Sequence, residues 1–164
     1  CRGAQGSACG PALRINGEAV TVQPVDGYLL LTREWQPGDT VELSLPMVPH
    51  RVWAHPAVRE DAGKVALQRG PMVYCLEEAD NGPDLHRLLL PRDTEITEEF
   101  RPDLLEGVMV LHAAGLAETA PGGSLYTTEP PAPPEPRPLT FIPYYAWANR
   151  GEGEMTVWLR EAIV

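Results

Sequence analysis

Proline and glycine are spread along this 164-residue chain, and their spacing limits the secondary structure that the sequence can form. The 18 prolines and 15 glycines fall between short apolar runs, so few stretches are long enough for a stable helix. Short runs bounded by turn residues are typical of strands in all-β proteins. The sequence therefore predicts an all-β chain with many tight turns.

Several of these runs alternate apolar and polar residues with the period of two that a half-buried strand shows. Residues 12–23 hold Asn16-Gly17 between two alternating runs, which predicts a tight two-residue hairpin. Residues 28–35 (YLLLTREW) and 40–46 (TVELSLP) alternate in the same way. We expect all of these segments to form antiparallel strands with one buried face.

The middle of the chain contains two breaks in this pattern. Residues 64–77 form two extended runs separated by Gly70-Pro71, and a proline inside such a run predicts a bulge or kink. Arg69 stands beside this break, and we expect it to pair with an acidic side chain, with a ligand contact as the alternative. Residues 94–105 (TEITEEFRPDLL) are predicted to hold at most one helical turn, because Pro102 prevents a longer helix.

The strands are too many for one small sheet, and we expect them to form antiparallel β-sandwiches of the jelly-roll type. The polar segment 58–63 (VREDAG) is the clearest candidate for a domain boundary. We therefore predict that residues 1–62 are the remainder of a first sandwich and that residues 63–164 form a complete second one. Residues 1–10 are small and polar and do not fit the sandwich pattern.

Charge and hydropathy exclude several classes of partner. A net charge of −10 argues against nucleic acid, which needs a basic protein face, and against an anionic membrane surface. No run of 18 apolar residues and no signal peptide is present, so we expect a cytoplasmic protein. The chain begins with Cys1 instead of methionine, so we expect a fragment, a processed product or an incompletely recorded reading frame.

The titratable residues show no catalytic or metal-binding pattern, so we predict no catalytic, cofactor-binding or metal-ligating residue in this chain. The adjacent pairs Glu77-Glu78 and Glu98-Glu99 should point apart and face solvent. Cys75 lies in an apolar run and is expected to be a small buried residue. The other cysteines, Cys1 and Cys9, lack the spacing of metal ligands. Among the four histidines only His50 and His55 are close in sequence, and five positions apart on an extended chain they should point to opposite faces.

Aromatic residues concentrate in residues 142–159 (IPYYAWANRGEGEMTVWL), which present either a sugar-stacking surface or a core hairpin. Alternation on both sides of the Asn-Arg-Gly turn favours two paired strands whose aromatic side chains fill a buried face. In the alternative, Tyr145, Trp147 and Trp158 are exposed and contact carbohydrate.

Three long blocks of this sequence resemble the C-terminal part of glycoside hydrolase family 127, the bacterial β-L-arabinofuranosidases and their relatives. The blocks are LTREWQPGDTVELSLPM, DAGKVALQRGPMVYCLEE and IPYYAWANRGEGEMTVWL, in this order along the chain. The resemblance extends from about Leu13 to Leu159 and does not include residues 1–10.

The resemblance implies a large enzyme in which an (α/α)₆ barrel precedes β-sandwich domains. It also implies that a zinc site of three cysteines and a glutamate, holding the cysteine nucleophile, lies in that barrel, to which none of the cysteines here can be matched. We therefore expect a non-catalytic accessory region without its own cofactor, which packs on the catalytic barrel or makes a homodimer contact. The alternative is a carbohydrate-binding module.

Overall fold

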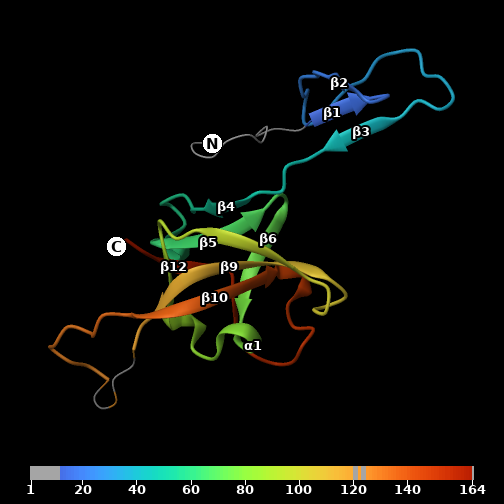
Figure 1. Ribbon diagram of the computed structural model, residues 1–164. Coiled ribbons are helices and arrows are strands. Elements are labelled where there is room, and N and C mark those ends of the chain that lie inside the picture. Colours follow the sequence, from blue (N-terminus) through green and yellow to red (C-terminus); the bar gives the residue numbers. More distant parts are fainter. Residues whose placement is uncertain (1–11, 120–121, 123–124, 164) are drawn as a thin grey trace. The chain divides into compact units, whose positions relative to one another are not determined.

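The computed structural model describes residues 12–119, 122 and 125–163. Strands account for 43% of the residues and helices for 9%, which confirms the all-β prediction. The chain divides into two compact units, residues 1–48 and 49–164 (Figure 1). None of the described helices is long and apolar enough to cross a membrane.

The division lies earlier in the chain than the polar segment at residues 58–63 suggested. Strand β4 (Pro49–Val52) pairs antiparallel with β5 (Lys64–Arg69), so the residues between these strands belong to the second unit. The polar segment is a connection within that unit and contains the 3₁₀ turn η1 (Arg59–Asp61). A hydrophilic stretch between two strands marks a turn at the surface and does not by itself separate domains.

The first unit contains a small antiparallel sheet in the order β2-β1-β3. Its strands are β1 (Ala12–Ile15), β2 (Glu18–Val20) and β3 (Val41–Ser44). Asn16 and Gly17 join β1 to β2 with φ angles of 52° and 82°. Two consecutive positive φ angles define the type I′ turn, which confirms the predicted two-residue hairpin.

Alternation in the rest of the first unit does not lead to burial. Val41 and Leu43 remain 47% and 50% exposed, although β3 has the pattern of a half-buried strand. Residues 28–35 form no ladder within the described part of the chain, apart from the bridge between Val25 and Tyr28. The prediction of a half-buried β3 and of a strand at 28–35 is therefore wrong for this structure.

The second unit is built from nine strands and four short helical turns among its described residues. Besides β4, β5 and η1, these are β6 (Met72–Glu77), α1 (Glu78–Asn81), η2 (Leu85–Arg87), β7 (Leu88–Pro91), β8 (Ile96–Arg101), β9 (Val108–Ala117), β10 (Glu135–Pro143), η3 (Tyr144–Ala146), β11 (Met155–Thr156) and β12 (Leu159–Ala162).

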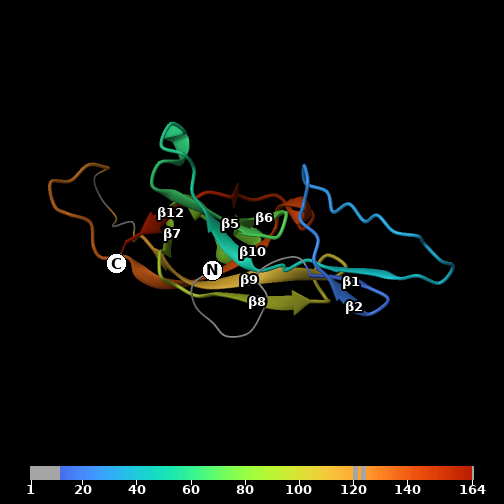
Figure 2. The same cartoon turned by 90° about the horizontal axis from the view of Figure 1, so that it is seen from above.

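Six of these strands close into a barrel (Figures 1 and 2). The order of pairing is β6-β10-β9-β7-β12-β5, and β5 pairs with β6 to complete the ring. All neighbours are antiparallel except β12 and β7, which run parallel. The remaining strands β4, β8 and β11, called the outer strands below, lie beyond the six-strand ring order and each pair with one ring strand, β5, β9 and β6 respectively. A continuous ring has no two separate sheets, so the predicted sandwich is not confirmed.

The turn that joins β5 to β6 allows the ring to close. Gly70 has a φ of 55°, and Pro71, which cannot adopt a positive φ, follows it. This combination fits a type II′ hairpin turn, which pairs Arg69 with Met72. The proline thus marks a turn and not the bulge predicted from the sequence. Arg69 forms an ion pair with Glu98, as expected.

The predicted helical turn at residues 94–105 is a strand. β8 pairs with β9 from Ile96 opposite Ala113 to Arg101 opposite Val108. Thr and Ile at the start of the segment and Phe100 near its end favour an extended chain, and the long neighbouring strand β9 supplies the partner. The helix propensity of this segment is weak, so its pairing with β9 determines that it is extended.

Side chains from all six ring strands meet inside the barrel. The fully buried ones are large and apolar, and they include Tyr74, Leu76, Leu90, Leu111, Leu139 and Phe141. Gly115 lies where a Cβ atom would come within 2.4 Å of the Leu139 side chain, so only glycine fits at this point of β9. Cys75 is buried as predicted.

The chain's two phenylalanines provide a matched test of this core. Truncating Phe141 to alanine should lower the free energy of unfolding by about 3–5 kcal/mol, because the side chain is fully buried in the barrel. Truncating Phe100, which is 59% exposed on β8, should cost less than about 1 kcal/mol. Urea denaturation monitored by circular dichroism measures both. Equal losses would contradict the assignment of Phe141 to the core.

Candidate functional site

The segment between β10 and β11 does not form the hairpin that the sequence suggested. β10 and β11 both pair with β6, on its opposite sides, so the chain passes over the end of β6 from one side to the other. The strand stops at Pro143, and η3 then changes the side-chain period from two to about three. Ala146 is buried as a result, while Tyr144 and Tyr145 are 45% and 67% exposed.

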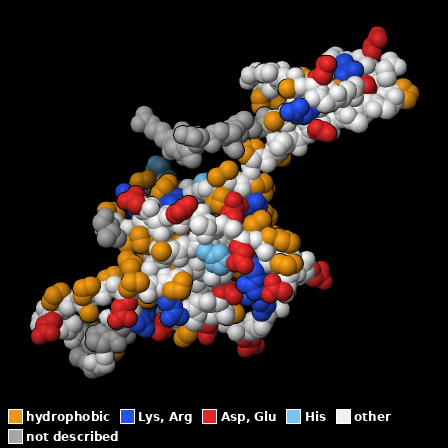
Figure 3. Space-filling model, viewed as in Figure 1, with side chains coloured by type: hydrophobic (Ala, Val, Ile, Leu, Met, Phe, Trp, Pro, Cys, Tyr) orange, Lys and Arg blue, Asp and Glu red, His pale blue; other side chains and the backbone are white. Residues whose placement is uncertain are grey.

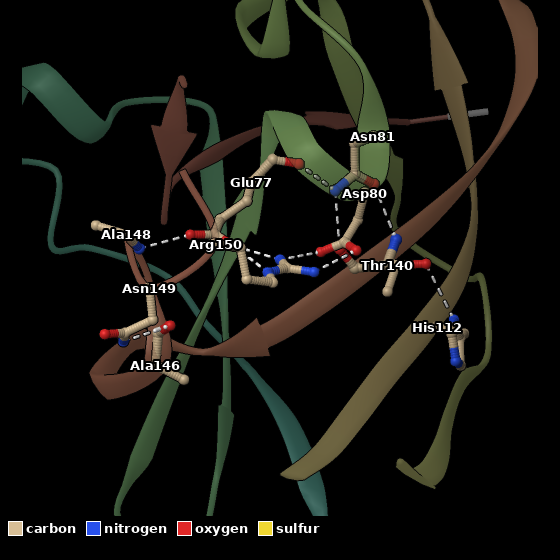
Figure 4. A network of polar contacts seen from close by, with 9 residues as sticks. All are labelled: Glu77, Asp80, Asn81, His112, Thr140, Ala146, Ala148, Asn149 and Arg150. Carbon is tan, nitrogen blue, oxygen red and sulfur yellow. Dashed lines mark hydrogen bonds and ion pairs between the residues drawn. The ribbon is translucent and has the colours of Figure 1, made fainter. Parts of the chain in front are cut away.

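A buried carboxylate holds this crossing segment in place. Glu77 ends β6, is only 6% exposed, and accepts the backbone N–H of Ala148 at 2.7 Å. Its other oxygen accepts from Nε of Arg150 at 3.1 Å and is ion-paired with the Arg150 guanidinium. Figure 4 shows both contacts from the end of β6 to the loop. The prediction that Glu77 faces solvent is therefore wrong.

Arg150 joins two carboxylates of the neighbouring elements. In addition to Glu77, it binds Asp80 of α1, with 2.8 Å between Nη1 and Oδ1. The hydrogen bond to Asp80, with the bond to Glu77 adding to it, raises the pKa of the Arg150 guanidinium against the opposing effect of burial. Because the Arg150 guanidinium bonds to two carboxylates at once, the direction of this side chain and of the loop that carries it is fixed.

Asn81 extends the network from α1 into the barrel wall. Its side chain, 2% exposed, donates to the carbonyl groups of Glu77 and Thr140, both at 2.9 Å, and accepts the N–H of Thr140 at 2.9 Å. The Thr140 hydroxyl lies 3.3 Å from Nδ1 of His112 (Figure 4). Every hydrogen-bonding position of the Asn81 amide faces a backbone partner except one lone pair, so α1 is rigidly attached to β10.

The crossing segment forms one wall of a cleft of about 510 Å³. Its lining residues come from the end of β6, from α1 and from the loop, and they are Glu77, Glu78, Ala79, Trp147, Ala148, Arg150, Gly151, Glu152, Gly153 and Glu154. Besides Glu77, two more of its carboxylates bind backbone groups: Glu78 accepts the N–H of Glu154 at 2.9 Å, and Glu154 accepts the N–H of Leu85 at 2.8 Å. The acids therefore shape the cleft by fixing its walls.

The three residues that the sequence suggested as carbohydrate contacts do not lie at one site in the structure. Trp147, 39% exposed, lines this cleft. Trp158, partly buried, lines a second cleft of about 530 Å³ together with Tyr144. Tyr145 lines neither. The rings of Tyr144 and Trp147 lie 6.3 Å apart and are tilted by 37°, so they do not form a coplanar platform.

The aromatic residues do not fill the core as the hairpin interpretation required. Phe141 and Ile142 occupy that place, and the aromatic side chains that follow in the loop lie at its surface. The role of Glu77 was missed because an ion pair across 73 positions leaves no local signal. The one available hint was an acid that ends the apolar run MVYCLE.

Family models match both units of the chain. The C-terminal domain of glycoside hydrolase family 127 matches residues 49–160, and the GH127 middle domain of β-L-arabinofuranosidase matches residues 6–47. The two matches meet where the structure divides into its compact units. The chain belongs to glycoside hydrolase family 127 and contains its middle- and C-terminal-domain sequences.

Individual relatives agree with this assignment. A non-reducing end β-L-arabinofuranosidase of Bifidobacterium longum subsp. longum is 38% identical over 156 residues, which are 90% of this chain and 23% of that enzyme. A GH127 β-L-arabinofuranosidase from Geobacillus stearothermophilus T6 is 50% identical, with a TM-score of 0.87 over 93% of this chain and 25% of its own. A GH127 β-arabinofuranosidase of solved structure is 37% identical, with a TM-score of 0.83 over 97% and 24%. The chain thus spans about a quarter of the length of these relatives.

Replacing Arg150 by methionine should lower the free energy of unfolding by about 3 kcal/mol, because Glu77 is left buried without its charged partner. Adding Glu77→Gln should restore part of this loss, since the glutamine is neutral and can still accept from Ala148. Arg101→Met is the matched control, because Arg101 binds Asp103 with two similar bonds at the surface. Denaturant melts compare the variants. Equal effects of the two arginine substitutions would show that burial of the ion pair is unimportant.

Proposed function

We propose that this chain is a non-catalytic accessory region of a β-L-arabinofuranosidase-like glycoside hydrolase, with a structural role. The observation that carries the proposal is the match to the middle and C-terminal domains of the family, together with the small share of each relative that the chain spans. The relatives named as arabinofuranosidases have about three quarters of their length outside the matching part.

The described residues do not fit the zinc-bound cysteine nucleophile that the family resemblance implies. No three His, Cys, Asp or Glu side chains within the described ranges gather where they could hold a metal ion. Cys75 is fully buried, and burial raises the pKa of its thiol to about 12. A nucleophilic or metal-bound cysteine must be a thiolate, so Cys75 is suited to packing and not to chemistry.

The polar network also supports a structural role. Glu77, Glu78 and Glu154 each accept a backbone N–H, and Glu77 is neutralised by Arg150. Whichever nucleophile a glycosidase uses, a carboxyl group that takes part in its chemistry has to be free to exchange a proton or to contact the sugar. These carboxylates are occupied in holding the loop to the barrel.

Exposed apolar side chains in the first unit support packing against another domain. Val41, Leu43 and Leu45 of β3 and its extension are 47%, 50% and 57% exposed, although they alternate like the buried face of a strand. A group of exposed apolar side chains of this kind is typical of a surface that another domain or chain covers. The catalytic (α/α)₆ barrel of the parent enzyme is the partner we propose, with a second copy of the chain as the alternative.

The 164-residue chain should neither hydrolyse a synthetic β-L-arabinofuranoside nor bind stoichiometric zinc, because it supplies no thiolate site in its described part. Chromogenic assays and elemental analysis of the purified protein measure the two properties. A Cys75→Ala variant is the matched control for any residual zinc or turnover. Hydrolysis above the buffer blank that a chelator abolishes would contradict the proposal.

A further inference from the structure

Two side chains at the cleft between α1 and the β10–β11 loop have polar groups that the described part of the chain does not use. Trp147 presents part of its ring to the cleft, and its indole N–H makes no hydrogen bond to a described residue. The carboxylate of Glu152 on the same wall is exposed and has no hydrogen-bond or ion-pair partner among the described residues. Unlike the carboxylates of Glu78 and Glu154, these two groups make no contact that holds the walls of the cleft together.

The backbone beside Trp147 is strained. Ala148 has a φ of 63°, a left-handed conformation that costs a residue with a Cβ atom free energy. Its N–H bond to Glu77 and the Arg150 ion pair to the same carboxylate hold the strained residue in place (Figure 4). Strain that the surrounding contacts maintain is typical of binding and catalytic sites. Here it fixes the chain next to Trp147, so the wall is preorganised before any ligand arrives.

From this geometry we infer that the cleft is a binding site for a neutral carbohydrate. The exposed face of the Trp147 ring would stack on the C–H face of a sugar, and its indole N–H and the Glu152 carboxylate would bond to hydroxyl groups. The volume of about 510 Å³ lies within the range of about 300–1,000 Å³ that is usual for small-molecule pockets. The inference rests on the proposed function, because an accessory region of a glycoside hydrolase would meet carbohydrate chains.

The charges of the lining residues limit which ligands can bind in the cleft. Glu78, Glu152 and Glu154 line the cleft, and Arg150, its one cationic lining residue, is already paired with two acids. Anionic sugars would therefore be repelled. A quaternary amine is recognised by several aromatic faces around the cation, whereas Trp147 is the single aromatic residue in this lining. A neutral ligand with one apolar face and many hydroxyls fits these groups best.

The test is a titration of the isotope-labelled 164-residue chain, monitored by backbone amide and tryptophan indole NMR signals. The probes are a neutral arabino-oligosaccharide, an oligogalacturonate of similar length and choline. We expect the neutral sugar alone to shift the signals of Trp147, Gly151 and Glu152. Absence of any shift, shifts remote from the cleft, or a stronger response to choline or oligogalacturonate would overturn the inference.

Variants then connect binding to the two side chains. Trp147→Ala should weaken binding about tenfold or more, as expected for the loss of an aromatic contact and a hydrogen bond. Glu152→Gln should weaken it severalfold. Trp53→Ala and Glu135→Gln change exposed residues of the same unit outside the cleft and should bind like the parent. Unchanged binding by Trp147→Ala, with the melting temperature of each variant recorded in parallel, would contradict the site.

The outcome of the sugar-binding test can be distinguished from the outcome of the zinc and activity test of the proposed function. A chain that binds no sugar and has neither zinc nor activity refutes the cleft and leaves the accessory role intact. A chain that hydrolyses arabinofuranoside refutes the accessory role, whatever its cleft binds.

Discussion

The pairing of β5 with β6 closes the ring of strands in the second unit, and the rest of that unit depends on this closure. The turn at Gly70 and Pro71 joins these two strands. β5 also pairs with β12, where Val65 lies opposite Leu159. Because the ring has no free edge, the inward-facing side chains of all six strands share one interior. Without this pairing, that interior would be open along one side and its apolar side chains would face water.

Closure also determines where the polar network must lie. β10 and β11 pair with opposite edges of the ring strand β6, so the chain leaving β10 has to cross the end of β6 to reach β11. That crossing packs Ala146 against a second buried cluster with Cys75 and Ile142, where unpaired backbone polar groups are costly. Glu77 and Arg150 meet this requirement together, and the same contacts form the wall of the cleft. Figure 3 shows acidic and basic side chains intermixed over the visible face of this unit.

Much of the local structure could be predicted from the sequence. The all-β class, the Asn16-Gly17 hairpin, the two strands within residues 64–77 and the burial of Cys75 all follow from patterns a few residues long. Alternation of apolar residues indicated extended chain correctly in β3, but it could not show that Val41 and Leu43 stay exposed. Whether a face is covered depends on residues distant in the sequence.

The errors concern contacts between distant parts of the chain. The hairpin at residues 142–159 had suitable alternation on both sides of a turn, yet both arms pair with β6, and Tyr144, Tyr145 and Trp147 are exposed. A sandwich and a closed barrel have the same short alternating strands, and they differ only in which strands pair. The ion pair of Glu77 and Arg150 could not be predicted for the same reason, since no local sequence pattern identifies the partner of either residue.

Hydrogen exchange of the backbone amides, measured by NMR on the whole chain, tests the central claim that the second unit is a closed barrel. If the ring is closed, protected amides of β5, β6 and β12 should exchange with the same high free energy of opening as those of β9 and β10, because no ring strand is an edge. The outer strands β4, β8 and β11 should exchange faster. Fast exchange along β5 or β12, at rates like those of the outer strands, would show an open sheet and contradict the account.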